Sequence, residues 1–151
     1  MIKLNFRAAV RDLIELLDIN GCLIVADALN CQKETAKLII KNGGDYLLSA
    51  KDNHSELKAE IADYVNDKDL QKTMDKASKI DKNRGRVERR TAYVANDIDW
   101  LFGKEQWQNL ACIGAINTKF TTAKGTTNEW HYYISSRNLT AKELLTHARL
   151  E

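Results

Sequence analysis

The sequence lacks long apolar runs, and this absence excludes two classes of protein. No apolar stretch in the 151 residues approaches the roughly 20 residues that a membrane-spanning helix needs. The opening segment, MIKLNFRAAVRD, also lacks the continuous apolar core of a secretory signal peptide. We therefore expect a cytoplasmic protein that has no membrane partner.

Cysteine and histidine are also scarce. The cysteines do not have the spacing of metal ligands, and Cys22 and Cys112 lie in apolar segments, which favours buried thiols in a reducing compartment. The histidines are scattered and suggest neither a zinc site nor a catalytic triad. The remaining cysteine is Cys31, and the histidines are His54, His131 and His147.

The size and composition fit one ordinary domain with a sizeable core. Apolar residues make up 44% and charged residues 29% of the chain, which is usual for a globular protein. The net charge of +2 conceals an asymmetry, because residues 71–90 hold eight Lys and Arg against three Asp and Glu. This basic stretch could attract a phosphate backbone or could be a solvated loop with surplus lysine. Composition alone does not decide between them.

The first part of the chain alternates helical and strand patterns. Apolar residues recur at helical spacing over residues 7–18, and the run CLIVA at 22–26 is typical of a short buried strand. A second helix is expected over residues 31–41 and a second buried strand over 45–51. This order predicts a crossover unit with two parallel strands.

The middle of the chain is expected to hold a third helix and then an irregular stretch. Asn53 and Glu56 have the spacing of a capping box at the helix start. The polar residues 66–83 lack a period and are expected to form a loop or a frayed helix end. From Gly85 onward the pattern changes to the alternation of strands, beginning with RVERRTAYVA.

The last part of the chain predicts antiparallel structure followed by a helix. The segments ACIGAINTKFT and TTNEWHYYISS flank AKG, which indicates a long hairpin with Gly125 in its turn. Thr140 and Glu143 form a capping box, and Leu139 and Leu144 form a hydrophobic staple. We expect a well-defined helix start there, with the helix running to the end of the chain.

Asp27 raises the main functional question, because it ends an apolar strand and precedes a helix. It could cap backbone amides at the entry to that helix. It could be a phosphoacceptor served by Lys51 on the next strand, although the acid pair that such a site needs is lacking. It could also be one carboxylate of a metal site for phosphoryl transfer on DNA, which requires further acids from elsewhere in the chain.

Four segments together resemble the DDE-type transposases of bacterial insertion sequences, in the group that includes the H-repeat-associated proteins. The longest segment, LIELLDINGCLIVADALNCQKETAKLIIKNGGDYLLSAKDNHSEL, has this family's strand ending in Asp-Ala, its Cys-Gln helix start and its Gly-x-Asp-Tyr strand. The others are GRVERR (85–90), DIDWL (97–101) and YYISS (132–136), in the family's order.

The resemblance implies an α/β, partial ribonuclease H-like fold with parallel strands and helices and an inserted antiparallel β region. It implies a single truncated catalytic-core domain over residues 1–151. The α/β part would cover about 1–70, the β-rich insertion about 85–136, and the start of the final helix 140–151.

The resemblance also assigns roles to particular residues. It makes Asp27 the second acid of the catalytic triad and a ligand of Mg²⁺ or Mn²⁺. It places Lys51 and Asn53 in the family's Lys-x-Asn positions. It makes the basic stretch around GRVERR a DNA-binding segment, in which a strand would put Arg86 and Arg90 on one face. The DNA-binding candidates are Lys51, Asn53, Arg84, Arg86, Arg89 and Arg90.

The sequence departs from the family at both ends. It contains neither the Asp-Gly-Lys segment of the first acid nor the Trp-x-Ile/Val-Glu pattern of the third, so Glu151 is not the triad glutamate. The pair Arg84-Gly85 replaces His-Gly, and His54 replaces a glutamine. We also expect an unpaired edge on the parallel sheet where upstream strands are missing.

These departures predict a fragment, the remnant of an insertion-sequence gene, that does not cleave DNA alone. The family's partners are the DNA ends of the insertion sequence. The alternative is a non-catalytic fragment that binds DNA through residues 72–90, self-associates or pairs with an intact transposase. A relic without activity is the third possibility.

Overall fold

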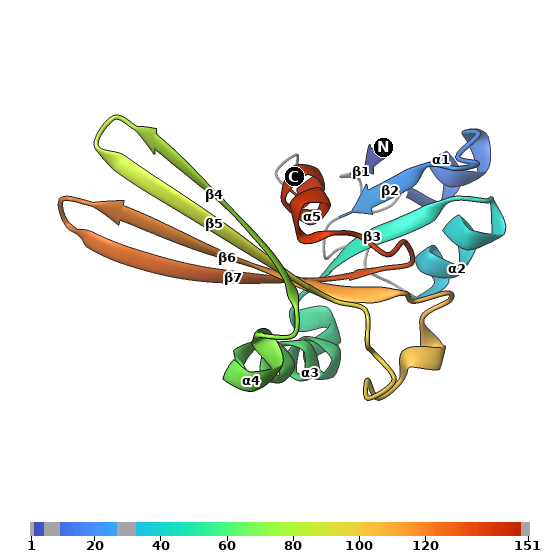
Figure 1. The fold of residues 1–151 in the computed structure, drawn as a ribbon. Coiled ribbons are helices and arrows are strands. Elements are labelled where there is room, and N and C mark those ends of the chain that lie inside the picture. The colour runs from blue at the N-terminus through green and yellow to red at the C-terminus, as the bar shows by residue number, and fades with distance from the viewer. Residues whose placement is uncertain (1, 5–9, 27–32, 149–151) are drawn as a thin grey trace.

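Seven strands form one mixed sheet in the computed structural model, in the order β1-β2-β3-β7-β6-β5-β4 (Figure 1). The structure describes residues 2–4, 10–26 and 33–148. The strands are β1 (Ile2–Leu4), β2 (Leu23–Ala26), β3 (Asp45–Ala50), β4 (Asp75–Asn83), β5 (Arg86–Ala95), β6 (Cys112–Thr122) and β7 (Gly125–Ser135). The helices are α1 (Val10–Leu16), α2 (Lys33–Lys41), α3 (Ser55–Asn66), α4 (Lys68–Gln71) and α5 (Ala141–Ala148).

The parallel part of the sheet confirms the predicted helix-strand-helix-strand unit. β1, β2 and β3 run parallel, with Leu23 aligned with Asp45 and Ala26 with Leu48. α2 ends where the sequence indicates, because Gly43 takes a left-handed φ of +83° and its amide bonds back to the Ile40 carbonyl. The carboxyl ends of β2 and β3 therefore lie at the same edge of the sheet.

The antiparallel part extends the same sheet, because β7 pairs with β3 in antiparallel fashion. The predicted β6–β7 hairpin is confirmed, with Thr122 paired to Gly125 at the turn. Gly125 has a φ of +133°, which side chains with a Cβ rarely adopt. The sheet thus continues without interruption from the parallel strands into the long hairpins that extend from it in Figure 1.

Helices cover the two faces of the sheet near its centre. Buried residues of α1, α2 and α3 pack in one apolar cluster with the Ile24, Tyr46 and Ile134 side chains of the sheet. Residues of α5 pack in a second cluster with Val25 and Leu47 on the opposite face. Figure 1 shows α3 and α4 on one side of the sheet and α5 on the other. The long hairpins extend beyond these helices.

Polar contacts tie the start of β3 to the residues that directly follow β7. The Asp45 carboxylate accepts hydrogen bonds from Ser136 Oγ at 2.9 Å and from Arg137 Nε at 3.2 Å. Ser136 Oγ also accepts a bond from the Tyr46 amide at 2.8 Å. Asp45, Tyr46 and Ser136 belong to the family-like segments of the sequence, and here their contacts hold the fold together.

Two sequence-based expectations need correction. Residues 66–83 are not a loop or frayed helix, because they contain α4 and the nine-residue strand β4. The expected open edge of the parallel part is not contradicted, because β1 ends the sheet and pairs only with β2 among the described strands. The third helix, α3, begins at Ser55 with His54 as its N-cap, one residue later than the expected N-cap at Asn53. None of the helices that the structure describes is long and apolar enough to cross a membrane.

Candidate nucleic-acid interface

The carboxyl edge of the parallel strands carries one group of predicted site residues. Asp27, the predicted catalytic and metal-binding acid, lies outside the described residues. Lys51 directly follows β3 and Asn53 lies in the 3₁₀ turn Asp52–His54, and both residues are exposed. Asp52 forms an ion pair with Lys58 Nζ at 3.3 Å. Lys51 and Asn53 are therefore placed together at the edge where β2 also ends.

Ser49 is a polar residue at this edge that the sequence did not single out. Its side chain is 2% exposed, and its hydroxyl has no hydrogen-bond partner among the residues that the structure describes. Strand alternation puts Ser49 on the same face as Leu47, which packs with α5. A serine one residue from a strand end gives no sequence signal for this burial.

The second group of predicted residues lies on the ribbon, the name used here for residues 75–83, 86–91, 117–122 and 125–131 of the four antiparallel strands. Arg84 occupies the turn between β4 and β5 with a φ of +49°, and Arg86 begins β5. The register aligns the end of β3 with Tyr132 of β7 and, across β6, with Tyr93 of β5. Tyr93 and Arg86 are seven residues apart on β5, which corresponds to about 23 Å of strand. Arg84 and Arg86 therefore lie at the far end of the ribbon from Lys51 and Asn53, whereas Arg89 and Arg90 lie nearer its base.

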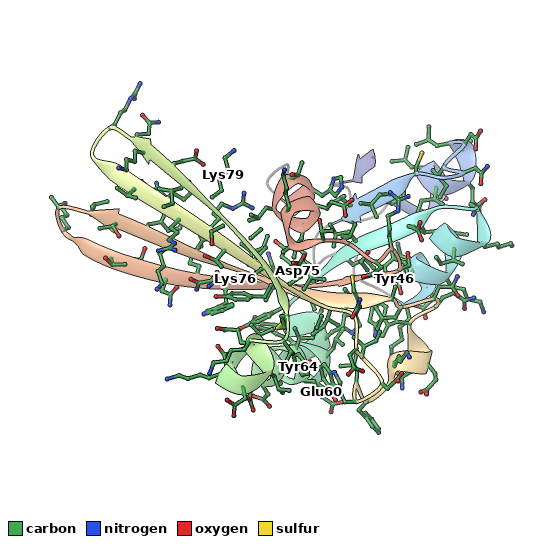
Figure 2. The ribbon with its side chains drawn as sticks, viewed as in Figure 1. Tyr46, Glu60, Tyr64, Asp75, Lys76 and Lys79 are labelled. Carbon is green, nitrogen blue, oxygen red and sulfur yellow. The ribbon has the colours of Figure 1, made fainter. Side chains whose placement is uncertain are left out.

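The two faces of the ribbon differ in charge. One face, called the lysine face, carries the exposed side chains of Lys76, Lys82, Arg89 and Lys119. All ribbon residues are described by the structure, and none on the lysine face is Asp or Glu. The other face, called the mixed face, carries Asp75, Lys79, Asp81, Arg86, Glu88, Arg90 and Glu129. Figure 2 labels Lys76 and Lys79, which project from opposite sides of β4.

The predicted arginines are divided between these faces. Arg86 and Arg90 share the mixed face, as expected for alternate residues of a strand, whereas Arg89 belongs to the lysine face. The Arg86 guanidinium lies 4.0 Å from the centre of the Phe120 ring. Arg90 is only 9% exposed, so it presents less surface to a phosphate than its neighbour Arg89, which is exposed.

Aromatic rings pack at the base of the lysine face. Trp130 stacks against both Tyr132 and Tyr93, with ring-centre distances of 6.2 and 6.0 Å. Lys76 Nζ lies 5.7 Å from the Tyr93 ring centre. Burial raises the pKa of Tyr132 above its ordinary value, although a hydrogen bond with Asn66 opposes this shift. The faces of these rings are used mainly for packing within the protein.

Comparison with known proteins gives the family. The family described as "Transposase DDE domain" matches residues 5–150. The Escherichia coli K12 protein "H repeat-associated putative transposase YhhI" is 32% identical over 156 residues, which cover 97% of this chain. The Xanthobacter autotrophicus protein "Uncharacterized protein in dhlA 3'region" is 32% identical over 117 residues, which cover 78% of this chain.

The chain spans about 40% of the length of both relatives. No solved structure matches the chain. The family match covers far more than half of the sequence and agrees with the order of the motifs. The chain therefore belongs to the DDE transposase family, in the group of the H repeat-associated transposases.

Proposed function

We propose that this chain is part of the catalytic core of a transposase that cleaves and transfers DNA strands within a ribonuclease H-like fold. The observation that carries the proposal is the family match over residues 5–150. Because the chain spans only about 40% of its relatives, the activity belongs to the complete protein under this proposal. Its substrate is the DNA of insertion-sequence ends, and its place of action is the cytoplasm.

Asp27 is the carboxylate that this chain contributes to the site under the proposal. Bound Mg²⁺ or Mn²⁺ would activate the attacking water or hydroxyl group and stabilise the leaving oxygen. The described residues do not form such a site by themselves, since no three His, Cys, Asp or Glu among them are grouped to hold a metal ion. What they offer at the edge beside β2 is the exposed ammonium of Lys51 and the amide of Asn53, both suited to phosphate oxygens.

Strand cleavage by this chain alone is not expected, because its sequence contains one of the family's three acid motifs. The test is incubation of the purified chain with supercoiled plasmid and Mg²⁺ or Mn²⁺. We expect no nicking above the metal-free control. Nicking by the chain that Asp27→Ala abolishes would contradict the proposal that other acids are required.

The DNA that flanks the coding sequence gives a second test of the assignment. We expect in-frame or frameshifted sequence that encodes Asp-Gly-Lys upstream and Trp-x-Val-Glu downstream. These segments would supply the missing acids. Flanks that encode neither would contradict the proposed catalytic role of Asp27 for this gene.

DNA binding without cleavage is the second candidate function, and the exposed basic ribbon favours it. In this case the chain binds DNA, self-associates or pairs with an intact transposase and inhibits it. Binding to DNA should then weaken with salt and survive Asp27→Ala, since Asp27 is not one of the ribbon residues. Binding that Asp27→Ala removes would contradict this function.

A further inference from the structure

We propose that the phosphate backbone of duplex DNA lies along the lysine face of the ribbon, and that the mixed face does not contact it. This inference rests on the proposed function for the choice of DNA as the ligand. It adds Lys76, Lys82 and Lys119 to the DNA-binding residues, and it separates Arg89 from Arg86 and Arg90.

The uncompensated charge of the lysine face is the first argument. Arg89 and Lys119 are directly opposite each other on neighbouring strands. Like charges in this position destabilise a sheet, and no acid on this fully described face offsets them. A row of phosphates would supply the missing negative charge. The cost of the charge pair is then offset when DNA binds.

The positive and negative charges of the mixed face largely balance each other. Lys79 and Arg90 are opposite each other, and the next pair on the same face is Asp81 and Glu88. A pair of cations beside a pair of anions has little attraction for a polyanion. Arg86 lies 4.0 Å from the Phe120 ring centre and Arg90 is 9% exposed, whereas Lys76 of the lysine face lies farther, at 5.7 Å, from the Tyr93 ring centre.

The uncharged residues of the lysine face also suit a sugar-phosphate backbone. Ser78, Thr121, Thr126 and Asn128 are exposed on it. Ser78 shares a hydrogen bond with Thr91, and Thr121 shares one with Thr126, so one hydroxyl of each pair can still donate to a phosphate oxygen. Trp130 is half-buried and stacks against two tyrosines, so part of its ring surface is already used within the protein. The face therefore favours backbone contact with a duplex over stacking with a single strand.

Two double variants with the same change in charge test this inference. Arg89→Gln with Lys119→Gln changes the lysine face, and Arg86→Gln with Lys79→Gln changes the mixed face. All four residues are exposed, and each variant removes one arginine and one lysine. The measurement is the Kd of each for a labelled random-sequence duplex, by fluorescence anisotropy at low salt, with circular dichroism to confirm folding.

We expect the lysine-face variant to bind at least about tenfold more weakly and the mixed-face variant to change by less than about threefold. Equal losses would overturn the assignment to one face, because net charge alone would then explain them. A larger loss in the mixed-face variant would overturn it too, while leaving DNA binding in place. Tighter binding of a single strand than of the duplex would overturn the choice of duplex. No duplex binding by the unchanged chain would refute the DNA-binding function itself.

Discussion

At the scale of the residue, the start of α5 depends on two side chains. Thr140 Oγ accepts a bond from the Glu143 amide at 3.1 Å, and Glu143 Oε1 accepts one from the Thr140 amide at 3.0 Å. The bond from the Thr140 amide is the largest cause that holds the pKa of the Glu143 carboxyl below its ordinary value. The reciprocal pair satisfies amides that the first turn of a helix otherwise leaves open.

The capping box predicts a pH dependence of stability. A carboxylate whose pKa is lowered by folding stabilises the protein above its unfolded pKa, and this contribution is lost as the pH falls through the lower folded pKa. The difference in free energy of unfolding between the unchanged chain and Glu143→Gln should therefore be largest near neutral pH and shrink in acid. Urea titrations at a series of pH values measure it.

Thr140→Ala is the control for this prediction. It removes the hydroxyl acceptor and should cost about 1 kcal/mol. The Thr140 hydroxyl does not itself titrate, so a cost should remain in acid. A Glu143→Gln difference that stays constant from neutral to acid pH would contradict the account of the cap.

For Ser49 we predict a substitution that increases the free energy of unfolding. Its buried hydroxyl is unpaired among the described residues, so Ser49→Ala should raise the free energy of unfolding by about 1 kcal/mol. Ser135→Ala is a matched control, because Ser135 is 1% exposed but bonds to the Arg137 carbonyl and amide at 2.9 and 3.1 Å. That variant should be destabilised by a similar amount. Thermal unfolding of both variants tests this, and a loss of stability in Ser49→Ala would show that its hydroxyl has a partner.

At the scale of the element, α5 approaches the sheet closely because β6 has a glycine beneath it. A Cβ at Gly114 would lie 2.6 Å from Leu144 Cδ2 and 3.3 Å from the Tyr93 carbonyl oxygen. Gly114→Ala should therefore destabilise the chain by about 1–3 kcal/mol through overpacking.

A double-mutant cycle with Leu144→Ala tests this packing. The single Leu144→Ala variant should cost about 2–5 kcal/mol, because it leaves a cavity under α5. The added methyl group at position 114 should partly fill that cavity. The double variant should therefore lose less than the two single variants together. Additive losses would show that Gly114 and Leu144 do not pack against each other.

Strands that enter the core were predictable from the sequence, and the exposed strand was not. Near the core, β5 and β6 are buried over consecutive apolar stretches, and the β6–β7 hairpin also carried a turn glycine. β4 is mostly exposed along its length and so has no apolar alternation to reveal it. Its strand form depends on pairing with β5, which is a tertiary contact.

At the scale of the whole molecule, the sequence indicated which residues were basic but not how they were divided between the two faces of the ribbon. The segment GRVERR suggested Arg86 and Arg90 as a pair of phosphate contacts. The register shows that Arg89 instead shares its face with Lys119, a residue 30 positions later in the chain. Sheet order and register determine that grouping, and neither can be derived from local patterns.

The assignment of Asp27 depends on the whole family and not on a local pattern. The strand before it and its parallel neighbour were predicted and confirmed. Asp27 itself lies outside the described residues, and its catalytic role stays a prediction. The fold places Lys51 and Asn53 at the shared edge of these two strands, which is where the proposed site needs basic and polar groups.

The most direct measurement of the central claim is the salt dependence of duplex binding. If Lys76, Lys82, Arg89 and Lys119 each meet a phosphate, log Kobs should fall with log salt concentration with a slope of about −3.6. Arg89→Gln with Lys119→Gln should reduce the magnitude of that slope by about 2. A slope that this variant leaves unchanged would contradict the account, because the lysine face would then make no phosphate contact through these two residues.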